Sequence, residues 1–435
     1  MKVTSFLLLY LLSLPLFAEP TEEREWRSTA GTTIKASAMS LAGGEVELKS
    51  ADGRLLKVPL DKLSDEDQAF LNEHFKQEEL EAEAGERGKT KGSSVPIVKD
   101  GLAQPVGEVS GPIDAGEGSN YFVYVPKTLR EGRKAPLMFI TGASGGSAGS
   151  VKRYIEAAEV NGQIIAASVE SRNGDDHPDG NHEHSKRCVA HLLETLPIDE
   201  NRVYFTGHSG GGAMSFYNAM RITSAGNMPI IGYAPDQEMN TKGYCYAIGG
   251  ATDYNRYLTA YARAQYGKRG VHRFVSGGHT NGPDSVGCEG ITWLNGRYLG
   301  DNAKDAALAN ERQDFEASMI DWIKELQGRA EHRAHYWCDF LLNSYEIKGA
   351  NVAAVEALLN ELQANPNNLR YTDGLVELDN FSDSFYADEG EGGGSKFNHT
   401  TSRIEKAAEQ LAEELAGVPE LEELAKQLGE KTVGK

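Results

Sequence analysis

The chain has 435 residues, of which 40% are hydrophobic and 25% charged, with 48 glycines and 15 prolines. This balance is ordinary for a folded, water-soluble protein, so it excludes collagen-like, low-complexity and membrane-bundle architectures. At roughly 100 to 200 residues per domain, the length predicts two or three folded units. The net charge of −20 repels phosphate backbones and anionic lipid headgroups, so neither nucleic acid nor a membrane surface is an expected partner.

The N-terminus has the pattern of a secretory signal peptide over residues 1–18. One positive charge at Lys2 precedes the apolar run FLLLYLLSLPLFA, which is short for a bilayer span, and Ala18 precedes the polar EPTEERE. No cysteine lies near this junction, which disfavours a lipoprotein anchor. We therefore expect a secreted or periplasmic protein with no membrane anchor after cleavage; an uncleaved anchor is the alternative.

Export makes the cysteines candidates for disulfide bonds, because an oxidising compartment preserves such bonds. The cysteines are Cys188, Cys245, Cys288 and Cys338. The sequence does not choose among their pairings, and buried free thiols are an equally good alternative. Their spacing lacks the CxxC pairs of a zinc site.

Residues 24–75 alternate apolar and polar residues in short runs, such as VEL at 46–48 and LKV at 56–58, between glycine-containing turns. This alternation predicts small antiparallel strands. Ser64, with Glu66 and Asp67 shortly after it, predicts the capped start of a short helix.

The same segment resembles the Sla-type homology domain, an SH3-like module of exported bacterial proteins. The resemblance rests on REW at 24–26, on the rhythm of strands and turns, and on VPLDKLS at 58–64. It implies a small SH3-like β-barrel that binds a peptide or protein partner, without placing the residues of the pocket. Trp26 suits a core position as well as a contact position.

The rest of the chain divides into three stretches of different character. Residues 76–110 are rich in Glu, Gly, Lys and Ser, which is typical of a flexible linker. In residues 111–327, strand-like runs alternate with helix-like runs, which predicts an α/β fold: a mostly parallel, doubly wound sheet with helices on both faces and ligands at the strands' carboxyl ends. Residues 328–435 have helical spacing and many glutamates, which predicts an acidic tail of solvated helices, and we assign it no chemistry.

The strongest functional signal is GHSGG at 207–211, which matches GxSxG between a strand-like run and a helix-like run. Glycines flank the serine because the strand must turn sharply into the helix. Such a turn exposes the hydroxyl, and the N-terminus of the helix favours developing negative charge. The pattern therefore predicts Ser209 as a nucleophile; the alternative is a simple strand-to-helix turn.

A nucleophilic serine needs a base that is oriented by an acid, and in this fold the chain order is serine, acid, histidine. Asp253 follows the strand-like run YCYAIGG and is preferred to Asp236, which ends the preceding run. His279 closes a glycine-rich turn after the last predicted strand. We expect His279 to take the proton of Ser209, and Asp253 to hold the imidazole tautomer.

Two backbone N–H groups are expected to hold the oxyanion that forms on the substrate. Gly210 directly follows the nucleophile, and Ala143 lies in the loop after the strand-like run LMFITG. The stretch DDHPDGNHEH at 175–184 invites a metal interpretation, but its spacing fits no known metal loop and a turn explains it as well. The expected hydrolysis needs neither a metal nor another cofactor.

Three runs resemble exported α/β-hydrolase esterases: PIDENRVY at 197–204, GHSGGGAM at 207–214 and GGH at 277–279. This group includes feruloyl and acetylxylan esterases and polyhydroxybutyrate depolymerase-like enzymes. The resemblance implies a secreted serine esterase acting on carbohydrate-linked or polyester-type esters through an acyl-enzyme. The chain departs from the group at residues 141–143, where TGA replaces the frequent His-Gly. The alternative function is a non-catalytic scaffold that binds partners through its N-terminal domain.

Overall fold

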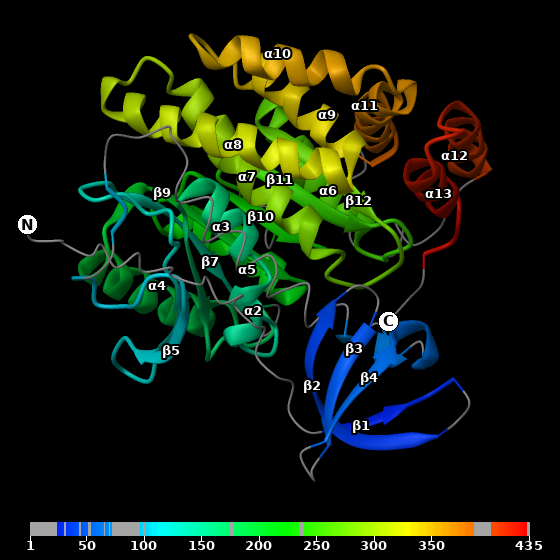
Figure 1. Cartoon of the computed structure of the whole chain (residues 1–435). Coiled ribbons are helices and arrows are strands. Elements are labelled where there is room, and N and C mark those ends of the chain that lie inside the picture. The colour runs from blue at the N-terminus through cyan, green and yellow to red at the C-terminus, as the bar shows by residue number, and fades with distance from the viewer. Residues whose placement is uncertain are drawn as a thin grey trace, which may run out of the picture. The chain divides into compact units, whose positions relative to one another are not determined.

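The computed structural model divides the chain into two compact units, Met1–Glu86 and Arg87–Lys435 (Figure 1). The residues that the structure describes are 24–29, 32–42, 45–50, 54–64, 66–68, 70–71, 96–98, 101–174, 177–234, 239–386 and 402–432. The predicted signal peptide, residues 1–18, lies outside them, as does much of the predicted linker.

The first unit contains a four-stranded antiparallel sheet in the order β1-β2-β3-β4. Its elements are β1 Arg24–Arg27, β2 Thr33–Ala42, β3 Glu45–Ser50, β4 Leu55–Pro59 and the 3-10 helix Leu60–Lys62. Trp26 is fully buried, and its Nε1 donates a hydrogen bond to Ala36 O at 2.8 Å. Trp26 is therefore a core residue, which decides between the two roles that the sequence left open.

The second unit is built on an eight-stranded sheet in the order β12-β11-β10-β9-β7-β8-β6-β5. The strands are β5 Val109–Asp114, β6 Asn120–Tyr124, β7 Ala135–Ile140, β8 Ile164–Ser168, β9 Ile198–His208, β10 Gly226–Ile230, β11 Tyr244–Gly250 and β12 Gly270–Val275. The six strands from β12 to β8 in this order, β7 included, pair in parallel with their neighbours within this group. Strand β6 pairs antiparallel with both β5 and β8. Strands β7, β8, β10 and β11 are buried along their whole length, as expected where helices cover both faces.

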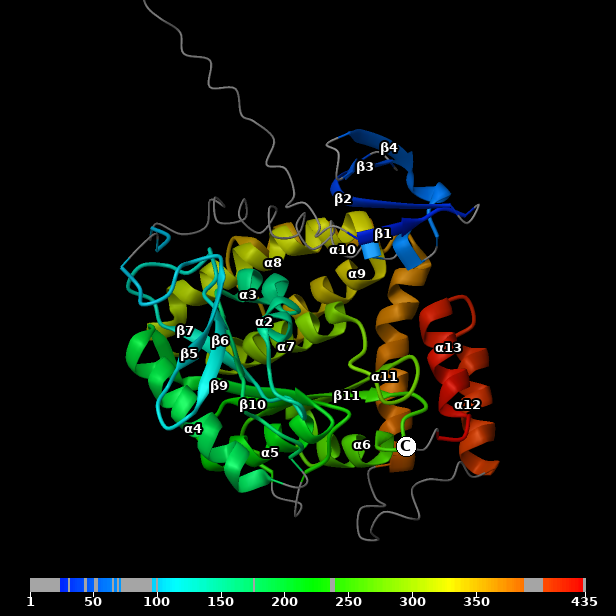
Figure 2. The same ribbon diagram turned by 90° about the horizontal axis from the view of Figure 1, so that it is seen from below.

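Helices cover the two faces of this sheet in separate groups. On one side lie α2, α3 and α7 with α8, and on the other lie α4, α5 and α6 (Figure 2). Their bounds are α2 Ala148–Lys152, α3 Ile155–Asn161, α4 Pro178–Thr195, α5 Gly210–Arg221, α6 Arg256–Ala264, α7 Asp284–Asp301 and α8 Ala309–Arg329. The predicted fold class, an α/β fold, is confirmed. A small sheet precedes the mixed sheet and its helices, and further helices follow them.

The end of the predicted linker packs on the second unit. Ile97 forms a β-bridge with Arg130, and Val106 forms one with Val125. Val98 is 9% exposed and belongs to the core cluster beneath β6 and β7. The second unit thus begins to pack ahead of residue 111, where the sequence analysis placed its start.

The C-terminal helices are packed on the sheet and on one another, unlike the solvated tail that the sequence predicted. They are α9 Glu331–Asp339, the π-helical turn Phe340–Ser344, α10 Asn351–Leu362, α11 Pro366–Tyr386, α12 Ser402–Glu414 and α13 Pro419–Leu428. Leu411 of α12 and Leu424 of α13 are buried in one cluster with Tyr257 of α6 and Phe274 of β12. The apolar residues recur at helical spacing, so they form a stripe that covers this edge of the sheet.

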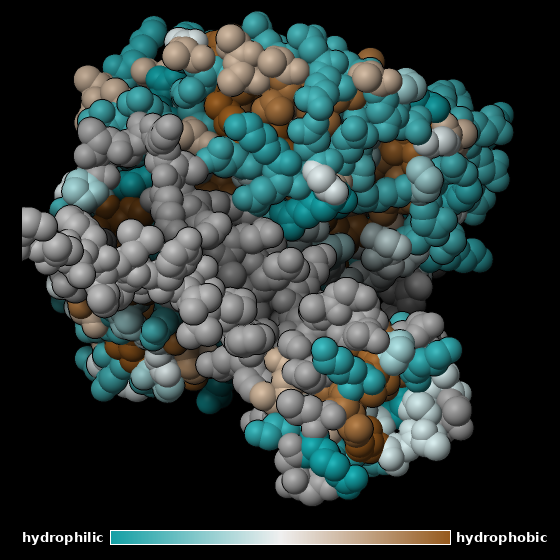
Figure 3. All heavy atoms as spheres, in the orientation of Figure 1, coloured by the Kyte–Doolittle hydropathy of each residue, from teal (hydrophilic) through white to brown (hydrophobic). Residues whose placement is uncertain are grey.

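The outward surface of these helices is largely hydrophilic in Figure 3, with smaller hydrophobic areas between them. This agrees with the acidic composition of the segment, because the charged residues occupy the positions that face water. Within the described residues, no helix combines the length and the apolarity that crossing a membrane requires.

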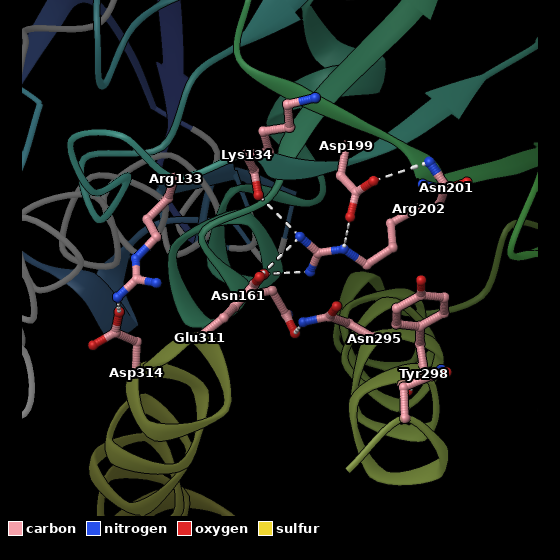
Figure 4. A network of polar contacts seen from close by, with 11 residues as sticks. Arg133, Lys134, Asn161, Asp199, Asn201, Arg202, Asn295, Tyr298, Glu311 and Asp314 are labelled. Carbon is pink, nitrogen blue, oxygen red and sulfur yellow. Dashed lines mark hydrogen bonds and ion pairs between the residues drawn. The ribbon is translucent and has the colours of Figure 1, made fainter. Parts of the chain in front are cut away.

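A buried ion network ties α8 to β9 (Figure 4). Arg202 is 1% exposed, and its Nε donates to Asp199 Oδ2 at 2.8 Å. Its Nη2 donates to Lys134 O at 2.9 Å and to Glu311 Oε2 at 3.0 Å, while Nη1 donates to Glu311 Oε1. The fork of the guanidinium therefore binds the carboxylate of Glu311 through two nitrogens, an arrangement that fixes both elements.

The variant Arg202→Met is expected to lower the free energy of unfolding of the second unit by about 3 kcal/mol, because it leaves the largely buried Glu311 carboxylate without its cation. Chemical denaturation followed by tryptophan fluorescence measures the loss. The matched control is Arg133→Met. The Arg133 side chain is 20% exposed, against 1% for Arg202, and its pair with Asp314 is longer, at 3.8 Å, so its loss should change stability by less than about 1 kcal/mol. Equal losses in the two variants would contradict a special role for the Arg202 network.

Candidate active site

Ser209 stands on a sharp turn between β9 and α5, at the carboxyl end of the central strands. Its backbone has φ 56° and ψ −119°, a strained conformation for a residue with a side chain. A Cβ atom at Gly207 or at Gly211 would come within 2.1 Å of Thr141 O, so the turn requires both glycines. A strand-to-helix turn of this kind in a sheet of this order is the architecture of the α/β-hydrolase fold.

The structure brings the predicted serine, histidine and aspartate into one hydrogen-bonded chain. His279 Nε2 lies 2.8 Å from Ser209 Oγ, and His279 Nδ1 lies 2.8 Å from Asp253 Oδ2. The three residues follow β9, β11 and β12, whose carboxyl ends meet at the same edge of the sheet. Both distances are within the range at which a base can take a proton directly.

The Asp253 carboxylate is fully buried and accepts on both oxygens. Asn255 N–H donates to Oδ1 at 2.6 Å, while Oδ2 faces His279 Nδ1. Burial raises the pKa of the Asp253 carboxyl above its usual value, and the hydrogen bonds from Asn255 and His279 oppose this shift. Because a carboxylate can only accept, the proton lies on Nδ1 of His279, and Nε2 offers its lone pair to Ser209.

The alternative acid and a second histidine beside the nucleophile do not replace Asp253 and His279 in the described structure. Asp236, the competing acid, lies outside the described residues. His208 packs edge-on against the imidazole of His279, with ring centroids 5.0 Å apart. Burial and the neighbouring His279 lower the pKa of His208 to about 4, which makes it a poor base near neutral pH.

Tyr254 is a site residue that the sequence analysis missed. Its ring stacks on the imidazole of His279, with centroids 4.8 Å apart and planes at 14°. Stacking on one face and the edge contact with His208 together restrict rotation of the imidazole. The only sequence signal was the position of Tyr254 directly after Asp253, which does not predict stacking by itself.

The loop that carries Ala143 is fastened beside the start of α5. Thr141 Oγ1 donates to Gly211 O at 3.2 Å, and Ser171 Oγ accepts from Gly142 N–H at 3.0 Å. These bonds hold residues 141–143 next to Gly210, the first residue of α5. The assignment of the N–H groups of Gly210 and Ala143 to the oxyanion stays a prediction.

Two of the three histidines of the DDHPDGNHEH stretch, His182 and His184, have separate partners. His182 Nδ1 lies 3.0 Å from Asn218 Oδ1, and His184 Nδ1 lies 2.9 Å from Ser119 Oγ. Asp175 and Asp176 lie outside the described residues. Among the residues that the structure describes, no three His, Cys, Asp or Glu side chains group as metal ligands.

The four cysteines all fall within the described ranges, and each is a buried free thiol. Burial raises the pKa of Cys188 and Cys338 to about 12, so these thiols stay protonated and unreactive near neutral pH.

Comparison with protein-family models matches residues 16–79 to SLA1 homology domain 1, SHD1. The chain therefore carries an SHD1 domain at its N-terminus. This agrees with the resemblance of residues 24–75 and with the small antiparallel sheet found there. A search of curated proteins finds no match.

Solved structures similar to the chain include several esterases. A thermostable esterase shares 20% identity over 40% of this chain and 58% of its own length, with a TM-score of 0.34. An esterase from the archaeon Pyrobaculum calidifontis shares 12% identity over 50% of this chain and 88% of its own, with a TM-score of 0.35. Acetyl xylan esterase from Aspergillus awamori shares 15% identity over 40% of this chain and 94% of its own, with a TM-score of 0.33.

Proposed function

We propose that this protein is a serine hydrolase that cleaves carboxylic esters through an acyl-enzyme on Ser209. The observation that carries the proposal is the chain of contacts from Asp253 through His279 to Ser209, with 2.8 Å at each link. A serine, a base and an orienting acid in this geometry are the parts that nucleophilic acyl transfer needs.

The reaction would proceed in two halves. His279 Nε2 takes the proton of Ser209 as Oγ attacks the ester carbonyl, and it then gives that proton to the leaving alkoxide. Asp253 stabilises the imidazolium that forms between these steps. In the second half, His279 takes a proton from water as the water oxygen attacks the acyl-enzyme. His279 then gives that proton to Ser209 Oγ as the bond to the acyl group breaks and the acid leaves.

The oxyanion of each tetrahedral intermediate would be held by the N–H groups of Gly210 and Ala143. Gly210 begins α5, so its N–H group also lies at the positive end of a helix. Loss of one such donor costs roughly 3 kcal/mol in transition-state stabilisation.

We further propose export of the chain and an ester substrate outside the cytoplasm, carbohydrate-linked or of polyester type. The support is the signal-peptide pattern of residues 1–18 and the resemblance of the catalytic runs to exported esterases. The SHD1 domain would bind a peptide or protein partner. The buried Trp26 cannot itself line that binding surface.

The test is hydrolysis of p-nitrophenyl acetate by the purified protein across pH. The rate is expected to rise between about pH 5 and 8, where a histidine ordinarily loses its proton and becomes able to act as a base. A panel of feruloyl, acetyl-xylan, glucuronoyl and hydroxybutyrate esters would then rank substrates. Absence of turnover on every ester, or a rate that stays flat over this pH range, would favour the scaffold alternative.

A further inference from the structure

The last helix of the chain contacts the loop that carries the proposed base. Gln427, on α13, accepts a hydrogen bond at Oε1 from Gly277 N–H at 2.9 Å. Its Nε2 donates to Ser276 Oγ at 2.8 Å. Gly277 lies two positions before His279, so one side chain of the C-terminal extension binds the backbone that presents the imidazole.

The orientation of the Gln427 amide is set by its surroundings. Nε2 also donates to Glu423 Oε1 at 2.9 Å, and a carboxylate can only accept. The amide nitrogen therefore faces Glu423 and Ser276, which leaves the oxygen toward Gly277 N–H. The amide nitrogen thus faces acceptors and the amide oxygen faces a donor, so a flipped amide would lose the contacts with Glu423 and with Gly277.

Gly277 also joins the base loop to the acid loop. Its carbonyl oxygen accepts from Thr252 N–H at 3.0 Å, and Thr252 directly precedes Asp253. The two loops are packed backbone to backbone, since a Cβ atom at Gly250 would come within 2.2 Å of Gly278 O. Gly277 has φ 90°, a conformation that glycine adopts readily and that residues with a side chain rarely adopt.

A second bridge runs from the acid loop to the end of α13. Arg256 is fully buried, and its backbone N–H donates to Asp253 O at 3.2 Å. Its guanidinium donates to Glu430 O at 3.1 Å, to Gln427 O at 3.4 Å and to Ala251 O. A cation next to the last carbonyl groups of a helix is also favoured by the helix dipole.

Helix α13 is itself firmly seated. Leu421, Leu424 and Leu428 are buried in the cluster that includes Tyr257 and Phe274. The contacts of Gln427 and Arg256 therefore tie the catalytic loops to a packed element rather than to a free chain end.

From these contacts we infer that Gln427 is a positioning residue for His279 and that α13 holds the base and acid loops in register. The inference rests on the proposed ester hydrolysis. Without the acceptor at Gly277 N–H, the glycine-rich loop has more freedom, and Nε2 of His279 spends less time within reach of Ser209 Oγ. The loop positions the base for proton transfer and does not bind the substrate. Removal of the hydrogen bond to Gly277 N–H should therefore lower kcat and leave KM nearly unchanged.

The test compares three variants of the full chain. Gln427→Met keeps the length of the side chain but removes the acceptor, and kcat is expected to fall about tenfold with KM within about twofold of wild type. Gln427→Glu keeps an oxygen that accepts from Gly277 N–H, and Glu423 is exposed, so water screens the added charge; kcat should stay within about threefold of wild type. The control is Gln410→Met, an exposed glutamine of α12 that pairs with Glu414, and it should leave kcat unchanged.

Each outcome of this comparison either supports or overturns the positioning role of Gln427. Suppose that the wild-type protein hydrolyses esters and that Gln427→Met and Gln410→Met have equal kcat. This result would overturn the positioning role and leave the proposed function intact. An equal fall in the Met and Glu variants would place the effect in helix packing rather than in the hydrogen bond, and it too would overturn the inference. If the wild-type protein turns over no ester, the proposed function fails and the inference falls with it.

Discussion

Ser209→Ala is expected to lower kcat for p-nitrophenyl acetate by at least about 10⁴-fold, which leaves only the residual rate that substrate binding and the oxyanion donors support. The reason is that Ser209 Oγ lies 2.8 Å from His279 Nε2, whereas the Tyr254 hydroxyl lies farther from that nitrogen, at 3.4 Å. The fold should survive, because alanine has the same Cβ as serine and the backbone strain at φ 56° is unchanged. Steady-state kinetics and the melting temperature together measure the two effects.

The control for this variant is Ser318→Ala, a serine on α8 far along the chain from the site. It should have the activity of the wild-type protein. If Ser209→Ala kept more than a few per cent of wild-type turnover after removal of contaminating esterases, the acyl-enzyme on Ser209 would be excluded.

Asp253→Asn is expected to lower kcat by a factor on the order of 10⁴ with little change in the fold. The asparagine has a single acceptor oxygen. This oxygen accepts from Asn255 N–H, which lies 2.6 Å from Oδ1 of the aspartate in the wild-type protein. The amide nitrogen then faces His279 Nδ1 and donates to it. This forces the imidazole proton onto Nε2, where it blocks transfer of the Ser209 proton.

The matched control is Asp321→Asn, on the surface of α8, which loses only a pair with Lys324 at 3.8 Å. Kinetics of the two variants over the same pH range would separate the effects. A loss of less than about tenfold in Asp253→Asn would mean that the carboxylate does not set the tautomer of His279.

The sequence predicts the parts of the site that depend on a local residue pattern or on the geometry of a parallel sheet. GHSGG at 207–211 predicts a turn because neighbouring side chains would collide there. In the structure, a Cβ atom added at Gly207 or at Gly211 would come within 2.1 Å of Thr141 O. Asp253 and His279 were predicted from their places after late strands, since the carboxyl ends of parallel strands meet at one edge.

The parts that the sequence does not predict are contacts between segments far apart in the chain. The apolar stripes of α12 and α13 show in the sequence as helical spacing, but the surface that they cover does not, so these helices were expected to face water. The contact of Gln427 with Gly277 leaves no trace in spacing or composition. The same holds for the stacking of Tyr254 on His279, and for the single-residue bridges of Ile97 and Val106, which are too short to produce a periodic pattern.

The most direct test of the central claim is to incubate the full-length protein with a fluorophosphonate, which reacts with activated serines, and to map the adduct by peptide mass spectrometry. The account predicts one modified residue, Ser209, with modification and ester turnover lost together and labelling abolished in Ser209→Ala. Unmodified Ser209 in a preparation whose esterase activity the probe has abolished, or an adduct on another serine, would contradict it.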